Sequence, residues 1–136
     1  MAQEVRVMPD FKVFISYGGS DPLWVERFRR CLAWRGVDSW LPPVPFPYGD
    51  DAGREAVKRA MRESDALVVL VTHEGVEHPA LYVEIGAAVG LNKPIIAVVP
   101  SDFDEALLPR FTRSAPHVIR QTPEQTAEAL VMLKAA

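Results

Sequence analysis

Two short apolar runs in the middle of the chain constrain its fold more than any other feature. Ala66–Thr72 reads ALVVLVT and Pro94–Val99 reads PIIAVV, with no alternation between apolar and polar residues. Because successive side chains of a strand point to opposite faces, strands of this kind are buried on both faces. Such strands are typical of the centre of a parallel sheet that helices cover on both sides.

Helix and strand signals alternate along the rest of the chain. Asp21 followed by Pro22 predicts a capped helix start, and Thr122-Pro123-Glu124-Gln125 is a capping box. Prolines and glycines, or polar residues, predict loops at Leu41–Asp51 and His73–His78. The remaining predicted strands are Phe11–Ser16, Val37–Trp40 and His117–Arg120, and the predicted helices are Pro22–Arg35, Gly53–Arg62, Pro79–Leu91 and Pro123–Lys134, with a weakly helical stretch at Asp102–Phe111.

This alternation predicts an α/β fold with a parallel sheet between two helix layers. The second and fifth strands are short and mixed in character, which suits edge strands. With right-handed crossovers, the pattern favours a flavodoxin-like three-layer sandwich whose five strands lie in the order 2-1-3-4-5, formed as one domain by residues 1–136. Ligands of such sheets bind beyond the carboxyl ends of the strands, here among the loops Tyr17–Asp21, Leu41–Asp51 and His73–Pro79.

Composition excludes several classes of function. The 136 residues carry a net charge of −3, which argues against nucleic acid as a direct partner. One cysteine rules out an internal disulfide and a thiolate zinc cluster. We expect a cytoplasmic protein with no metal site, no bound cofactor and no membrane segment, since neither a secretory signal nor an apolar span is visible. The acidic cluster of phospho-receivers, the GxGxxG fingerprint and the P-loop are also absent.

Glu84 is the strongest candidate for a functional residue. It lies in the predicted helix that follows the most apolar strand, beside the predicted site, and its neighbours one turn away are alanine and leucine. A carboxylate on an apolar helix face is costly unless it is exposed or has a partner. In a functional role it would bind hydroxyls or stabilise a cation. In a structural role it would lie at the rim of a buried helix or pair with a distant arginine. The residues alone leave both interpretations open.

Other chemistry-bearing residues have simpler interpretations. Cys31 shares a helix face with Trp24 and Phe28 and is predicted to be inert core. Trp34 and Trp40 are predicted to pack rather than to stack on a ligand.

Several segments together resemble a TIR (Toll/interleukin-1 receptor) domain of the bacterial kind. They are Phe14-Ile15-Ser16-Tyr17 with Asp21, Val37–Trp40 with the proline-rich loop after it, Arg62-Glu63-Ser64-Asp65 before VVLVT, Glu84-Ile85-Gly86-x-Ala88, and Lys93-Pro94-Ile95-Ile96. The resemblance covers about residues 11–134. It implies the same five-stranded fold and an NAD+ glycohydrolase that cleaves the nicotinamide–ribose bond, releasing ADP-ribose or a cyclic ADP-ribose.

The resemblance also implies roles for individual residues. Glu84 would be the catalytic carboxylate, and NAD+ would be a substrate rather than a cofactor. The implied substrate-binding residues are Ser16, Tyr17, Gly18, Asp21, Trp40, Phe46, Tyr48 and Ala80. Family members assemble through the loop after the second strand, so homo-oligomeric assembly in bacterial anti-phage immune signalling is implied, with an interface that includes Pro43, Pro45, Phe46, Pro47, Tyr48 and Gly49.

One departure from the family pattern stands out. Ala80 occupies the position where many active members carry a tryptophan that walls the nicotinamide side. Two other functions stay open: a non-catalytic TIR adaptor that only self-associates, and an enzyme resembling nucleoside deoxyribosyltransferases. The latter group usually has an acidic residue directly after the first strand, where this chain has Ser16-Tyr17-Gly18.

Overall fold

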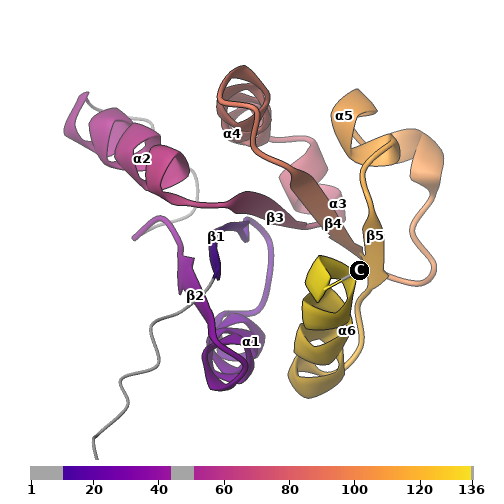
Figure 1. Cartoon of the computed structure of the whole chain (residues 1–136). Helices are drawn as coiled ribbons and strands as arrows, with labels where there is room; N and C mark the ends of the chain where they lie inside the picture. Colours follow the sequence, from indigo (N-terminus) through magenta and orange to yellow (C-terminus); the bar gives the residue numbers. More distant parts are fainter. Residues whose placement is uncertain (1–10, 44–50, 136) are drawn as a thin grey trace, which may run out of the picture.

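Strands and helices alternate along the chain, as the apolar pattern predicts. The computed structural model describes residues 11–43 and 51–135, and Figure 1 shows how the elements are arranged. In chain order they are β1 (Phe11–Ser16), α1 (Pro22–Trp34), β2 (Val37–Trp40), α2 (Asp51–Glu63), β3 (Ala66–Leu70), α3 (His73–Val76), α4 (Pro79–Gly90), β4 (Ile95–Val99), the 3₁₀ turn η1 (Glu105–Leu107), α5 (Arg110–Arg113), β5 (His117–Ile119) and α6 (Pro123–Ala135).

The five strands form one parallel sheet in the order β2-β1-β3-β4-β5, which confirms the predicted topology. In the register of the central strands, Val13 lies beside Ala66 and Leu67 lies beside Ile95. Every residue of β3 and β4 is buried. The two edge strands are shorter than β1 and partly exposed. The apolar runs therefore occupy the middle of the sheet because only there are both faces covered.

Helices on the two faces of the sheet enclose two separate hydrophobic cores (Figure 1). On one face Val68 packs in a cluster with Phe28 of α1 and Leu130 of α6. On the other face Val69 packs in a cluster with Met61 of α2 and with residues of α4. Alternate residues of the same strand therefore serve different cores, which explains why its sequence shows no polar alternation.

The predicted starts of α1 and α6 are present, whereas α2 begins at Asp51, two residues before its predicted start at Gly53. The Asp21 carboxylate accepts a hydrogen bond from the Leu23 backbone N–H (3.1 Å), and Pro22 is the first residue of α1. At the start of α6, the Gln125 N–H donates to the Thr122 hydroxyl (3.1 Å), and the Gln125 side-chain oxygen accepts from the Thr122 N–H (3.4 Å). This is the reciprocal pair of a capping box.

Three details differ from the sequence-based expectations. The segment predicted as a polar loop at 73–78 contains the one-turn helix α3, because Thr72 caps it. Cys31 is only half-buried, although it packs against the core beneath α1 and α6 as its register predicts. Trp34 is 87% exposed, so its predicted packing role is wrong.

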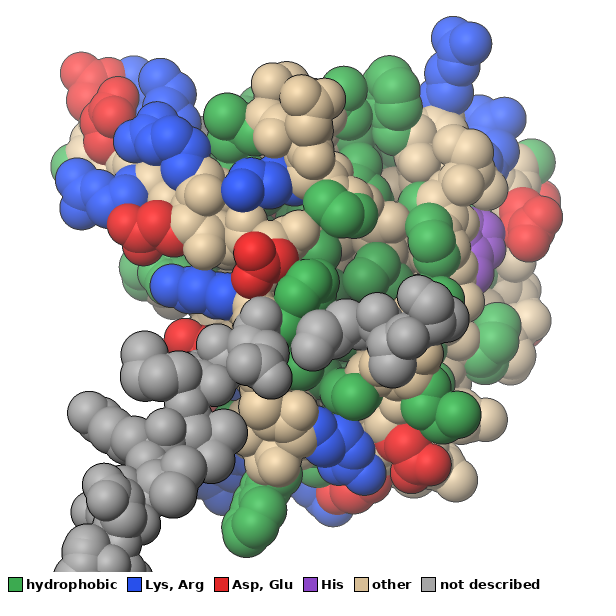
Figure 2. Space-filling model, viewed as in Figure 1, with side chains coloured by type: hydrophobic (Ala, Val, Ile, Leu, Met, Phe, Trp, Pro, Cys, Tyr) green, Lys and Arg blue, Asp and Glu red, His purple; other side chains and the backbone are tan. Residues whose placement is uncertain are grey.

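The outer surface differs between two neighbouring helices. Charged side chains gather over α2, at the upper left of Figure 2, whereas the surface over α4 is mostly apolar. Tyr82, Val83 and Val89 are the large exposed side chains of α4, and its one ionisable acid, Glu84, is buried. In the parts of the chain that the structure describes, no helix has the length and apolar character needed to cross a bilayer.

Candidate active site

Glu84 lies on the inner face of α4, the helix that follows β3 and α3. Its side chain is almost completely buried, with a relative exposure of 2%. The same helix face contributes Leu81 and Ile85 to the core against β3. The connections that leave β1 and β3 run to opposite faces of the sheet, so a crevice opens between their carboxyl ends. Glu84 is therefore placed where ligands of this architecture bind.

Tyr17 lies close enough to Glu84 for the charge of the carboxylate to affect the pKa of the phenol. Its hydroxyl donates a hydrogen bond to the Pro42 carbonyl oxygen (2.7 Å), which joins the loop after β1 to the segment after β2. Burial raises the pKa of the Tyr17 phenol above its usual value of 10.0, and the negative charge of Glu84 raises this pKa further. The phenol is therefore neutral at physiological pH, and its hydroxyl is a donor that lies within the field of the Glu84 carboxylate.

A tight turn carries the chain from β1 to α1. The Ser20 N–H donates to the Tyr17 carbonyl (2.9 Å), and Gly19 has φ +79°, in the region that favours glycine. The turn places Ser16 and Gly18 in buried positions, and Asp21 is exposed and caps α1. Asp21 thus satisfies a helix terminus, which accounts for its carboxylate without any ligand.

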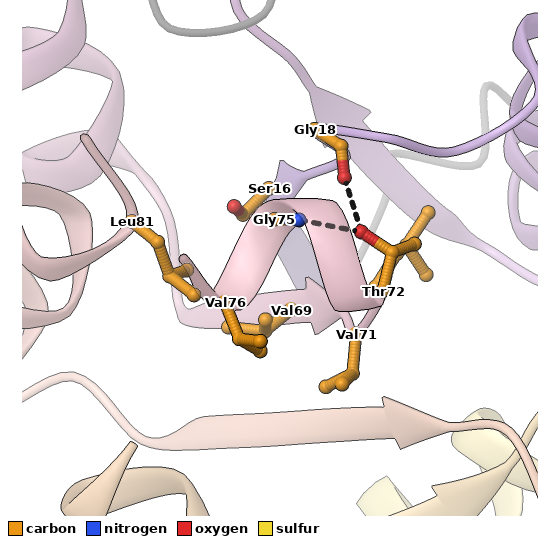
Figure 3. Close-up of a pocket in the computed structure, with 9 residues that line it drawn as sticks. Ser16, Gly18, Val69, Val71, Thr72, Gly75, Val76 and Leu81 are labelled. Carbon is orange, nitrogen blue, oxygen red and sulfur yellow. Dashed lines mark hydrogen bonds between the residues drawn. The ribbon is translucent and has the colours of Figure 1, made fainter. Parts of the chain in front are cut away.

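The turn also touches α3 through Thr72 (Figure 3). The Thr72 hydroxyl donates to the Gly18 carbonyl oxygen (2.8 Å) and accepts from the Gly75 N–H (2.9 Å). Beneath this contact lies a cavity of about 10 Å³, which is the space of a single water molecule. Its lining includes Ser16, Gly18, Thr72, Gly75 and several apolar residues of β3, α3 and α4.

The structure brings together part of the predicted site. Ser16 ends β1, Tyr17 and Gly18 follow it in the turn, and of these three Tyr17 lies in the field of Glu84. Ala80 is buried in the first turn of α4, where its N–H donates to His78 Nδ1 (3.2 Å).

The other predicted residues lie further out or cannot be placed. Trp40 packs against Phe14, with ring centroids 5.1 Å apart, which confirms the predicted packing role. Pro43 is exposed. The predicted substrate contacts Phe46 and Tyr48, and the interface residues Pro45, Pro47 and Gly49, lie outside the described residues.

Sequence reasoning missed Thr72 and Gly75. The apolar pattern places Thr72 at the end of a strand, whereas in the structure it caps α3 by accepting from the Gly75 N–H. The available signal was a threonine directly after an apolar strand with an acidic residue, Glu74, in the following turn, which is a pattern of helix N-termini.

The comparisons with known proteins agree with the fold. A family model described as "TIR domain" matches residues 13–131. No curated protein matches the chain. Among solved structures, the CMP N-glycosidase BcmB of Clostridium botulinum is similar with a TM-score of 0.68 and 17% identity, covering 90% of this chain and 98% of that one. A 2-deoxyribosyltransferase of Bacillus psychrosaccharolyticus is similar with a TM-score of 0.57 and 13% identity, covering 85% and 90%.

Proposed function

The chain belongs to the TIR domain family, and on that premise we propose that it is a glycosidase that cleaves the nicotinamide–ribose bond of NAD+. The observation that carries the proposal is the buried carboxylate of Glu84 at the carboxyl edge of the sheet, with the neutral phenol of Tyr17 in its field. A carboxylate preorganised in a water-poor site stabilises developing positive charge far better than bulk water does.

In the proposed reaction, the bond between ribose C1′ and the pyridinium nitrogen breaks. Its electron pair goes to that nitrogen, so nicotinamide leaves as a neutral molecule and the ribose acquires oxocarbenium character. Glu84 would face this cation and hold the ribose hydroxyls. Water then adds to C1′ and loses a proton to solvent, which gives ADP-ribose, whereas attack by a group of the same ADP-ribosyl unit would give a cyclic product.

The small volume of the cavity beside Ser16 bears on where the ribose would bind. A space of about 10 Å³ holds one water molecule and no sugar ring. We therefore place the ribose on the other side of the first loop, between Tyr17 and Glu84. Recognition there would use the backbone of the turn and the phenol oxygen of Tyr17 as an acceptor, because the Tyr17 O–H donates to Pro42 and Asp21 caps α1.

A second candidate is hydrolysis of a nucleoside monophosphate. The similarity in fold to a CMP N-glycosidase favours it, and the similarity to a 2-deoxyribosyltransferase favours nucleosides more generally. The same Glu84 would stabilise the same kind of cation with a different leaving base. A non-catalytic TIR adaptor is the remaining alternative, and it predicts no cleavage of any of these compounds.

Assembly and biological setting belong to the same proposal. We propose that the domain self-associates, that assembly raises its activity, and that it serves immune signalling in the bacterial cytoplasm. The support is family membership. For this reason activity should be measured at high protein concentration as well as at low concentration.

The test is to incubate concentrated protein with NAD+, with CMP and with a 2′-deoxynucleoside, and to identify the products by mass. Glu84→Gln keeps the size of the side chain but removes its charge. We expect cleavage of NAD+ to fall by about 100- to 1000-fold. Glu77→Gln is the matched control, since Glu77 is an exposed glutamate just before the same helix, and it should leave the rate unchanged.

Melting curves of both variants accompany the rates, so that loss of folding is not mistaken for loss of catalysis. A normally folded Glu84→Gln protein that cleaves NAD+ at the wild-type rate would remove the proposed mechanism. Cleavage of CMP in place of NAD+ would transfer the mechanism to the second candidate.

A further inference from the structure

Thr72 makes two hydrogen bonds of different kinds at the carboxyl edge of the sheet (Figure 3). The bond from the Gly75 N–H to its hydroxyl oxygen is local and caps α3. The bond from its hydroxyl to the Gly18 carbonyl spans 54 residues of sequence and joins the turn after β1 to the segment after β3. A helix cap needs only the hydrogen bond from the Gly75 N–H, so capping does not explain the hydrogen bond to Gly18.

Two glycines leave room for this hydroxyl. A Cβ atom at Gly75 would lie 2.8 Å from Thr72 Oγ1 and 2.9 Å from the Gly18 carbonyl oxygen, and a Cβ atom at Gly19 would lie 2.5 Å from Thr72 Oγ1. Real Cβ atoms do not approach other atoms so closely. The backbones of the two turns therefore meet at a distance that only glycine permits, with the Thr72 hydroxyl between them.

The two segments that meet at Thr72 carry the two sides of the candidate active site. Gly18 directly follows Tyr17, whose phenol lies in the field of Glu84. On the other side, α4 carries Glu84 and is attached to α3 by a hydrogen bond from the Tyr82 hydroxyl to the Val76 carbonyl (3.2 Å). Thr72 thus connects the turn that carries Tyr17 with α3 and, through α3, with α4, which carries Glu84.

We propose that Thr72 is a positioning residue of the reaction: its hydroxyl holds the Tyr17 turn in register with the helix that carries Glu84. The inference rests on the glycosidase function proposed above. Thr72 touches neither the ribose nor the leaving base, and it acts through Gly18 and Tyr17 on one side and through α3 on the other. Displacement of the turn would misplace the substrate relative to Glu84, and a misplacement of about 1 Å can cost about 100-fold in rate.

The experiment compares Thr72→Val with Thr72→Ser. Valine keeps the branched shape and loses both hydrogen bonds, whereas serine keeps the hydroxyl. We expect kcat for the cleaved substrate to fall by about 10- to 100-fold in Thr72→Val while KM changes much less, and we expect serine to restore most of kcat. If the valine variant does not fold, Thr72→Ala replaces it.

Thr112→Val is the matched control. Thr112 is a buried threonine whose hydroxyl, like that of the half-buried Thr72, donates to a carbonyl, here that of Pro109 (2.7 Å), but both residues belong to the same turn at α5. This variant should lose stability and keep kcat per folded molecule. A Thr72→Val enzyme with wild-type kcat would overturn the proposal, and so would a serine variant as impaired as the valine variant.

A second measurement needs no substrate and separates this inference from the proposed function. The Tyr17 phenol is titrated by ultraviolet absorbance, with Tyr17→Phe to identify its signal among the tyrosines. If Thr72 holds the turn near Glu84, the pKa of Tyr17 should fall toward 10.0 in Thr72→Val and stay raised in Thr112→Val. An unchanged Tyr17 titration in Thr72→Val would overturn the positioning role even if the wild-type protein cleaves NAD+. If no compound is cleaved by any form, the proposed function fails, and the titration still decides whether Thr72 positions the turn.

Discussion

The cavities at the two ends of the sheet differ in volume and in the side chains that line them. At the carboxyl edge a cavity of only about 10 Å³ has two polar side chains, Ser16 and Thr72, in a lining that is otherwise mostly apolar. At the amino edge an open depression of about 300 Å³ is almost wholly apolar. Its lining residues are Phe11, Ala66, Pro94, Ile95, Ile96, Pro116 and Leu133. No polar side chain lines the larger depression, so none is available there to orient a substrate. The volume of a cavity alone therefore does not indicate an active site.

The buried polar groups make the same distinction. Away from the carboxyl edge they are satisfied within their own turn or helix end, as when the Ser64 hydroxyl donates to the Ala60 carbonyl (2.7 Å). At the carboxyl edge, the half-buried Tyr17 and Thr72 instead make hydrogen bonds between segments far apart in the sequence. At the amino edge, the long-range bond from the Lys12 N–H to the Asp65 carboxylate (2.8 Å) is exposed. Hydrogen bonds of the first kind end helices, and those of the second kind position loops relative to one another. We therefore expect substitutions at the two edges to have different consequences for stability and activity.

The largest effect on stability is expected for Gly75→Ala at the carboxyl edge. The added methyl group would have to displace Thr72 or Gly18, and overpacking of this kind costs about 1–3 kcal/mol in the free energy of unfolding. Gly86→Ala is the control, since nothing lies near a Cβ there and alanine stabilises a helix by about 0.8–1 kcal/mol relative to glycine. Urea unfolding of both variants measures the contrast. Equal stability of the two variants would contradict the close contact at Thr72.

A smaller effect is expected for Leu133→Ala at the amino edge. Leu133 is half-buried in α6 beside the apolar depression, so its truncation should cost about 1–2 kcal/mol, less than the loss of a fully buried leucine. Because Leu133 lies at the edge opposite the loops that carry Tyr17 and Thr72, the cleavage rate per folded molecule should stay unchanged. A drop in kcat without a drop in folded fraction would show that the two edges are coupled.

The smallest effect is expected for Tyr17→Phe. The variant loses the hydrogen bond to the Pro42 carbonyl, which is worth about 0.5–1.5 kcal/mol. The pH dependence has a definite sign. The pKa of Tyr17 is raised in the folded state, so the wild type keeps this contribution below pH 10.0 and loses it as the pH rises from 10.0 through the folded-state pKa. The wild type should therefore melt at a higher temperature than Tyr17→Phe at pH 8, and this difference should shrink above pH 10. A difference that does not change with pH would contradict the raised pKa of Tyr17.

The sequence alone predicted the sheet, its order and most element boundaries. The unbroken apolar runs identified β3 and β4, and Asp21 and the Thr122–Gln125 box marked the starts of α1 and α6. These signals are local, since a cap or a strand pattern is set by residues within about four positions of one another. The resemblance to TIR domains likewise rests on short segments in a fixed order.

Only the tertiary structure decided which turns meet and how closely. The contact between Thr72 and Gly18 and the burial of Glu84 near Tyr17 bring together segments that lie more than 50 residues apart in the sequence. The exposure of Trp34 and the partial exposure of Cys31 are likewise not visible in the helical spacing of α1. A sequence pattern specifies which face of an element is buried, but the distance between two loops follows from the crossovers and the packing of both layers, which no local pattern encodes.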